Sequence, residues 1–219
     1  MEIKNKPQAD PAANLKIVDA YLRWALIAAE EVVGRQGINV VLREAGLERV
    51  IGNLPADTLK ATGNFTFGEY ASLNAALLNF FGRAAKSMVL RIGRLSAKQG
   101  IDQQSAMFGL AALVASKLLP YSAQVKLLLE AMRDGFDKVY GRKMHLVVED
   151  RDDHYAYLDY ECANCAGKQS DAPMCWIHLG VIQEGVRWQT GKEADVKEVA
   201  CRALGDEACV WAVSKTPKE

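Results

Sequence analysis

Cysteines in the last part of the chain have a spacing that suits metal ligands. Thiolates are soft, charged ligands that favour zinc, and zinc takes four ligands in a tetrahedron. Cys175, Cys201 and Cys209 supply three thiolates, and Glu198, which lies three residues before Cys201, could be the fourth ligand. An earlier CxxC pair offers two further thiolates. The candidate metal ligands are Cys162, Cys165, Cys175, Glu198, Cys201 and Cys209.

The same cysteines also have simpler interpretations. Free cysteines are often buried as small apolar residues, and spacing alone does not separate that reading from metal binding. The CxxC pair could be a redox dithiol, but Gly167, Ser170 and Pro173 after it are typical of a loop. All five cysteines lie after residue 160, and an odd number argues against a closed disulfide framework. We therefore predict a C-terminal module organised by a metal.

The composition narrows the class of protein. The 219 residues carry 27 basic and 27 acidic side chains, so no excess of positive charge attracts nucleic acid. Residues 1–11 lack the apolar core of a signal peptide, and the longest apolar run, residues 106–115, is about half of what spans a bilayer. We expect a cytoplasmic protein without a membrane span. In that reducing compartment, clustered cysteines favour metal binding.

The period of the apolar residues changes along the chain. The first two thirds show helical spacing, and the last third contains alternating, strand-like segments. Gly34 and Gly37 should end the first helix, Asp102 should cap a later one and Pro120 should break it. We predict helices over residues 15–33, 40–46, 66–81, 84–98, 103–119, 121–140 and 174–190, and strands over 144–149, 154–160, 195–203 and 209–214.

These elements give an α/β fold of the α+β kind, in which N-terminal helices pack on a small antiparallel sheet. Residues 1–140 form the helical part and residues 141–219 the metal-binding part, within one continuous domain. Cys175 should lie in the first turn of its helix, while Cys201 and Cys209 flank a tight turn. A zinc ion there would fix the last hairpin to the helix. Four protein ligands leave no place for a catalytic water, so the zinc would be structural.

The segment over residues 143–215 resembles the vinyl-4-reductase domain family, which includes the sensing part of bacterial phenol and toluene activators. The resemblance implies the wider fold of the TRAPP vesicle-tethering subunits. In the phenol sensors, three cysteines and a glutamate hold zinc, and these positions fall on Cys175, Glu198, Cys201 and Cys209. Residues 80–82 and the helix around Gly93 resemble the family more loosely. The matching motifs are Asp171-x-Pro-x-Cys175-Trp176, Leu179-Gly180, Glu198-x-x-Cys201 and Gly205-Asp206-x-x-Cys209.

The chain also departs from the phenol sensors. They lack the CxxC pair, so the fourth ligand stays open between Glu198, Cys162 and Cys165. A tryptophan that contacts the ligand in those sensors aligns with His154 here. Phenol itself is therefore not assumed as the ligand.

A ligand pocket is the second candidate site. The apolar helix predicted over residues 103–119 must be enclosed, either by other helices or around a cavity, and the resemblance favours a cavity. Its walls would include Met107, Phe108, Leu128 and Met132, with His154 as one polar anchor. We interpret His178, three residues after Cys175, as a surface or interface residue rather than a zinc ligand.

The predicted function is a sensor module that binds a small apolar or aromatic molecule and forms a homodimer. One alternative is a tetrapyrrole vinyl reductase, or its accessory protein, in chlorophyll or bacteriochlorophyll biosynthesis. Another is an assembly module. No nucleotide loop or catalytic triad occurs in the sequence, and no cofactor motif that could supply electrons is visible. We therefore assign no catalytic residue and do not expect enzyme activity.

Overall fold

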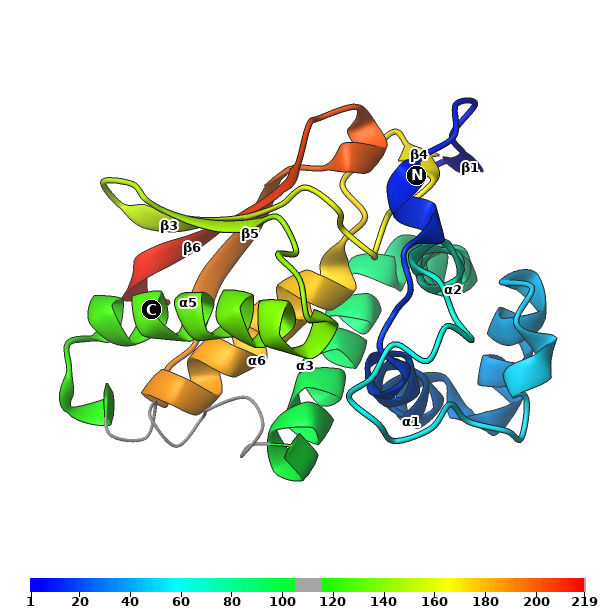
Figure 1. Cartoon of the computed structure of the whole chain (residues 1–219), viewed down its shortest axis with the longest axis horizontal. Coiled ribbons are helices and arrows are strands. Elements are labelled where there is room, and N and C mark those ends of the chain that lie inside the picture. Colours follow the sequence, from blue (N-terminus) through cyan, green and yellow to red (C-terminus); the bar gives the residue numbers. More distant parts are fainter. Residues whose placement is uncertain (105–115, 219) are drawn as a thin grey trace.

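A computed structural model describes residues 1–104 and 116–218 of the chain (Figure 1). Its helices are α1 (Asp19–Glu44), α2 (Phe67–Phe81), α3 (Ala85–Gln104), α5 (Tyr121–Tyr140) and α6 (Trp176–Thr190). Its strands are β1 (Ile3–Asn5), β2 (Leu146–Asp150), β3 (His154–Asp159), β4 (Lys168–Ser170), β5 (Ala194–Ala200) and β6 (Cys209–Pro217). The α+β class predicted from the sequence is confirmed.

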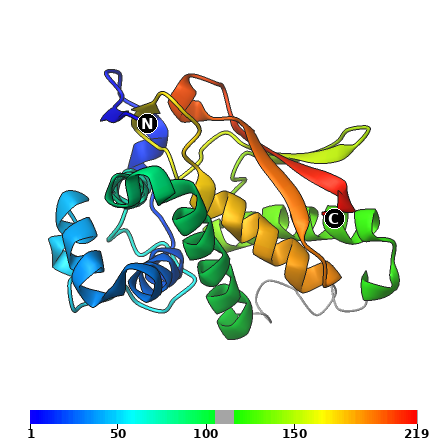
Figure 2. The same cartoon turned by 180° about the vertical axis from the view of Figure 1, so that it is seen from behind.

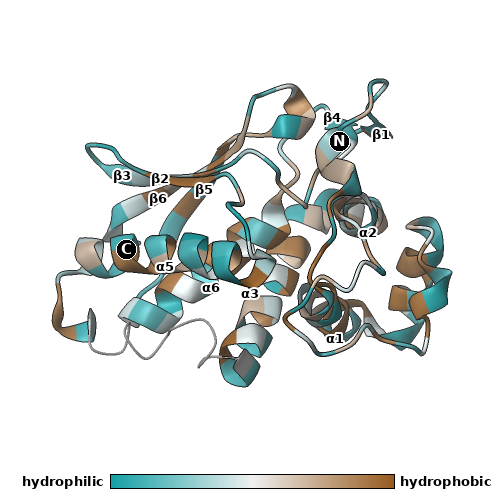
Figure 3. Ribbon diagram, in the orientation of Figure 1, coloured by the Kyte–Doolittle hydropathy of each residue, from teal (hydrophilic) through white to brown (hydrophobic). Residues whose placement is uncertain are grey.

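A four-stranded antiparallel sheet forms the upper layer in Figure 1, with the strand order β2-β3-β6-β5. Residues of β6 alternate in burial, so that Cys209, Trp211 and Val213 point into the core. Helices α5 and α6 lie against the sheet, and the polar β2–β3 turn extends beyond them (Figure 3). Both predicted hairpins are therefore confirmed, with small shifts at their ends.

The helices begin and end where the sequence places its capping residues. Thr66 starts α2 with a capping box, in which its side chain and that of Glu69 each accept a backbone N–H. Pro120 precedes α5, and Gly141 ends it in the left-handed conformation. Gly34 interrupts α1 with φ 74° and ψ 166°, although the helix resumes and continues to Glu44.

One predicted helix boundary is wrong. Asp102, expected to cap a new helix, lies inside α3, because the helical backbone continues without a break through Gly100 to Gln104. The remainder of the helix predicted over residues 103–119 falls largely on residues 105–115, outside the described part of the chain. The short 3-10 turn Ser116–Leu118 follows that gap.

Helices α3 and α6 cross in close contact, as seen from behind in Figure 2. The crossing depends on two glycines. A Cβ atom on Gly93 would lie 2.1 Å from the carbonyl oxygen of Ile177, and one on Gly180 would lie 2.3 Å from that of Leu90. Both distances are shorter than any normal contact, so only hydrogen side chains fit at the crossing.

The N-terminus is joined to the metal-binding part by a small ladder that the sequence did not suggest. Strand β1 pairs with β4 in antiparallel register, so that Ile3 lies opposite Ser170. Asp10 adds to this connection by accepting hydrogen bonds from the backbone N–H of Gly167 and from Arg202 Nη2. None of the helices in the described ranges is long and apolar enough to cross a membrane.

Candidate metal centre and adjoining cavity

The sulfur atoms of all five cysteines lie together in the core. Cys162 and Cys165 lie in the loop after β3, Cys175 caps α6, Cys201 follows β5 and Cys209 begins β6. Neighbouring Sγ atoms are 3.4 Å apart for Cys165 and Cys209, and 3.7 Å apart for Cys162 and Cys175. Cys175 Sγ is also 3.7 Å from the Sγ atoms of both Cys201 and Cys209. Every one of these side chains is fully buried.

Local hydrogen bonds hold the turn that carries Cys201 and Cys209. Asp206 accepts the backbone N–H of Cys201 at 2.8 Å, and Gly205 takes the left-handed conformation with φ 103°. The backbone N–H of Arg202 points at Cys209 Sγ, 3.4 Å away. The Gly205-Asp206 pair is therefore needed to bring both sulfur atoms to the same point.

Two overlapping groups of donor atoms could each hold a metal ion. One consists of Cys162, Cys165, Cys175 and Cys209, and the other of Cys175, Glu198, Cys201 and Cys209. Within each group the donor atoms lie within 4.8 Å of one another. Tetrahedral zinc with Zn–S bonds of about 2.3 Å requires sulfur atoms about 3.8 Å apart, which is close to the observed spacing. The cysteine prediction is thus met by a cluster that could bind metal.

Glu198 has the environment of a carboxylate that needs a cation. Its Oε2 atom accepts the backbone N–H of Cys175 at 3.0 Å, while its buried Oε1 atom has no hydrogen-bond partner among the described residues. Burial, followed by the charge of Cys201, raises the pKa of Glu198 to about 9. Burial also raises the pKa of the Cys175 and Cys209 thiols. A bound cation would reverse these shifts.

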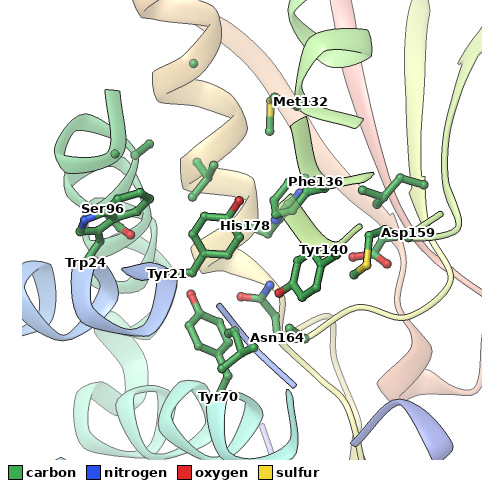
Figure 4. A pocket seen from close by; sticks show the side chains of 18 of the residues that line it. Tyr21, Trp24, Tyr70, Ser96, Met132, Phe136, Tyr140, Asp159, Asn164 and His178 are labelled. Carbon is green, nitrogen blue, oxygen red and sulfur yellow. The ribbon is translucent and has the colours of Figure 1, made fainter. Parts of the chain in front are cut away.

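A cavity of about 200 Å³ lies beside the cluster, between the helices and the sheet (Figure 4). Its walls are mainly aromatic and aliphatic, as is usual for small-molecule sites. The aromatic wall residues are Tyr21, Trp24, Phe67, Tyr70, Phe136, Tyr140 and Trp188. Leu128 and Met132, two of the predicted pocket residues, also line it, whereas Met107 and Phe108 lie outside the described residues.

Three polar atoms of the cavity wall are buried without a hydrogen-bond partner in the described part of the chain: Tyr21 Oη, Asn164 Oδ1 and His178 Nε2. In Figure 4 the hydroxyl of Tyr21 points toward His178. The His178 ring stacks on Tyr157 at 5.7 Å and lies 4.4 Å from the ring of Trp211. Burial lowers the pKa of His178, so this imidazole is neutral at physiological pH. Each unpartnered atom can hydrogen-bond to a guest.

The structure does not place His154 in this cavity, contrary to the sequence interpretation. His154 begins β3 beside the exposed turn, and its Nδ1 atom lies 2.6 Å from Asp153 Oδ1. His178, interpreted as a surface residue, is buried in the wall instead. The sequence carries a signal for this, because Ile182 and Gly185 lie four and seven residues later on the same buried face of α6.

The cavity and the cysteine cluster share one loop. Ala163 and Asn164 line the cavity, and they are the two residues between Cys162 and Cys165. Asn164 Nδ2 lies 3.9 Å from Cys162 Sγ, and its backbone oxygen accepts a hydrogen bond from Asn74. A change in the position of this loop would therefore be felt on both sides.

Comparison with known families places the cysteine-bearing segment. Residues 160–215 match the family model of the vinyl-4-reductase domain, so the chain contains a domain of this family. This confirms the resemblance carried by the motifs around Cys175, Cys201 and Cys209. A comparison with curated protein sequences gave no match.

The whole fold is similar to that of H-NOX proteins. The crystal structure of Fe(II) unliganded H-NOX protein from K. algicida has a TM-score of 0.60 and 12% identity, covering 92% of this chain and 98% of that one. A structure from a study of heme distortion in the H-NOX family gives 0.58 and 14%, covering 93% and 97%. An oxygen-binding H-NOX domain related to soluble guanylate cyclases gives 0.55 and 14%, covering 92% and 96%. At such identities the likeness shows the fold alone.

Proposed function

We propose that this chain is a sensor module that binds a small apolar or aromatic molecule in the cavity beside its cysteine cluster. The observation that supports this most directly is the cavity itself. Its walls are largely apolar, yet they carry unpartnered polar atoms on Tyr21, Asn164 and His178, counted among the described residues. Leaving such atoms unpaired costs about 1–3 kcal/mol each, and a guest that pairs with them removes this cost.

The volume of the cavity points to a guest of modest size. An apolar cavity of about 150 Å³ is large enough to take benzene. The cavity here measures about 200 Å³, which suits one aromatic ring with a small substituent or a short alkyl chain. Each methylene group that the guest buries would contribute about 0.8 kcal/mol.

The cysteine cluster would hold zinc in a structural role. Sulfur-rich tetrahedral sites suit zinc, and burial of every thiol excludes a catalytic water from the cluster. Zinc would keep the Cys162–Cys165 loop in place and so maintain one wall of the cavity. A cytoplasmic location fits this role, because the thiols must stay reduced.

Calorimetric titration with phenols, alkylbenzenes and short fatty acids tests the proposal. His178→Phe keeps a ring against Tyr157 and Trp211 but removes the polar atom. We expect it to weaken binding of phenols about fivefold, since one net hydrogen bond contributes about 1 kcal/mol. Binding of alkylbenzenes should be unchanged. His154→Ala is the matched control, since His154 lies outside the cavity, and it should bind all guests as the native chain does.

Absence of binding across this panel would contradict the sensor proposal. In that case the assembly module would become the leading function. A solid core would fit that role best, whereas the cavity between the helices and the sheet is open to a guest.

A tetrapyrrole is the second candidate guest. The H-NOX titles name heme and oxygen, and His178 Nε2 faces the cavity here with the donor type that ligates heme iron. The cavity of about 200 Å³ would have to enlarge to take such a ring, so we favour the smaller guest. Titration with hemin distinguishes the two, because histidine ligation would give a shifted Soret band that His178→Phe abolishes. The vinyl reductase alternative would additionally require an electron donor and is tested by turnover with a reductant.

A further inference from the structure

The two groups of candidate ligands have an unusual relation to each other. They share two members, Cys175 and Cys209, and differ in the other two. Cys162 and Cys165 complete one group, while Glu198 and Cys201 complete the other. We propose that the cluster binds two zinc-like divalent ions, one in each group, with the thiolates of Cys175 and Cys209 bridging them. The proposal rests on the proposed function in one respect, namely that these thiols bind metal.

The measured spacings suit two tetrahedra that share an edge. The shared edge would be the 3.7 Å between Cys175 Sγ and Cys209 Sγ. In the first tetrahedron, Cys165 Sγ lies 3.4 Å from Cys209 Sγ and Cys162 Sγ lies 3.7 Å from Cys175 Sγ. In the second, Cys201 Sγ lies 3.7 Å from Cys175 Sγ. All four distances approach the edge of about 3.8 Å that tetrahedral zinc sets.

Each half of the cluster has its own need for a cation. If only the half with Cys162 and Cys165 were filled, Glu198 Oε1 would remain buried without a partner among the described residues. If only the half with Glu198 and Cys201 were filled, Cys162 and Cys165 would remain as two fully buried thiols against the ligand sulfurs. Two ions give every donor atom of the cluster a partner.

Charge balance favours two ions as well. Five thiolates and one carboxylate carry six negative charges when all are ionised, and two divalent ions supply four positive ones. Cys175 is the N-cap of α6, where the helix dipole stabilises the remaining negative charge. The backbone N–H of Arg202, 3.4 Å from Cys209 Sγ, donates to the second shared sulfur. One ion with all ligands ionised would leave twice the excess charge in the core.

Native mass spectrometry and elemental analysis of the full chain, purified with zinc and freed of loose metal by brief EDTA treatment, test the stoichiometry. We expect two zinc ions per chain. The double variant Cys162→Ser/Cys165→Ser should retain one ion, and so should Glu198→Ala/Cys201→Ser, because each leaves the opposite group intact. The two double variants serve as controls for each other.

Cadmium NMR tests the bridge directly. Protein loaded with ¹¹³Cd should give two signals of equal intensity that are coupled to each other through the shared sulfurs. Each double variant should give one signal without that coupling. Both measurements can be made on the native chain alone if a variant does not fold.

The possible outcomes separate the two proposals. Two ions with coupled cadmium signals support the shared-thiolate cluster. One ion in the native chain overturns it and leaves the single structural zinc of the proposed function. Two uncoupled signals also overturn it, since the sulfurs are then not shared. No bound metal overturns both the cluster and the zinc of the proposed function.

Discussion

At Asp10, one buried carboxylate joins three parts of the chain. It accepts hydrogen bonds from Ala12 N–H at 3.1 Å, Gly167 N–H at 3.0 Å and Arg202 Nη2 at 2.9 Å. Burial acts to raise its pKa, but these donors together lower the pKa to about 2. The N-terminal segment is thereby attached to both loops that carry cysteines.

We predict that Asp10→Asn lowers the free energy of unfolding by about 2 kcal/mol at neutral pH, the size of a buried hydrogen bond to a charged group. The folded pKa lies below the unfolded value of about 3.9, so this stabilisation is complete above pH 4 and is lost as the pH falls toward 2. Urea unfolding should therefore show the native chain and the variant converging over that range. Asp153→Asn, at an exposed ion pair, should change stability little. Equal stability of Asp10→Asn and the native chain at pH 7 would contradict the prediction.

Individual site residues were predictable only where their chemistry required company. The cysteines and Glu198 stand at spacings that few other functions demand, and the structure brings them together. The pocket histidine was assigned to His154 because strand position alone says nothing about which end of a sheet meets a cavity. His178 was missed because its ring is held by Tyr157 and Trp211, which come from distant strands.

Among the elements, the crossing of α3 and α6 is the most sensitive to a single methyl group. Gly180→Ala would place a Cβ atom 2.3 Å from the carbonyl oxygen of Leu90, so the two helices would have to separate. We expect a loss of about 2 kcal/mol, as for other overpacked cores. The measurement is the midpoint of chemical unfolding.

Gly185→Ala in the same helix is the matched control. Its nearest neighbour is the end of the Leu128 side chain at 3.3 Å, which can shift, so it should cost less than Gly180→Ala. A smaller or equal effect of Gly180→Ala would show that the crossing can relax.

Element boundaries were predictable where the chain carries its own punctuation. Residues 121–140 match α5 because Pro120 and Gly141 bound it. The β1–β4 ladder was not predicted, since three-residue strands so far apart in sequence have no period to detect. Asp102 misled for a related reason: a capping residue does not start a helix when the preceding helix simply continues.

For the whole molecule, contacts between the two predicted parts bear on how the chain unfolds. The main hydrophobic core draws residues from both sides of residue 140, including Leu73 and Ile92 on one side and Ile177 and Trp211 on the other. Asn74 of α2 also donates hydrogen bonds to the backbone oxygens of Asn164 and Met174. We propose that residues 1–140 and 141–219 form one cooperative unit.

Thermal unfolding followed by helix ellipticity and by tryptophan fluorescence should therefore give a single shared midpoint. Removing metal should shift both probes equally, because the cysteine loops are part of the same core. Two separate transitions would contradict this prediction and would favour two independent domains.

The homodimer stays a prediction at the same scale. Val40 and Phe80 leave 50% and 42% of their surface exposed, and Phe80 packs beside Gly37 in the second half of α1. We expect sedimentation to give about twice the 24.0 kDa mass of the chain at micromolar concentration. Phe80→Glu should shift the protein to monomer, whereas Leu204→Glu, exposed on the last hairpin, should not. A native chain that sediments as a monomer would rule the dimer out.

The contact between α3 and α6 also has a mechanical consequence. Two helices that touch backbone to backbone cannot slide or spread without breaking that contact, so their share of the cavity wall acts as a rigid jaw. Helix α5 contributes Leu128, Met132 and Phe136 through longer, adaptable side chains, and it meets α6 without such a glycine crossing in the described part of the chain. We therefore expect a larger guest to be accommodated by displacement of α5. Because α5 also packs on β6, which begins at Cys209, that displacement would be transmitted to the sheet.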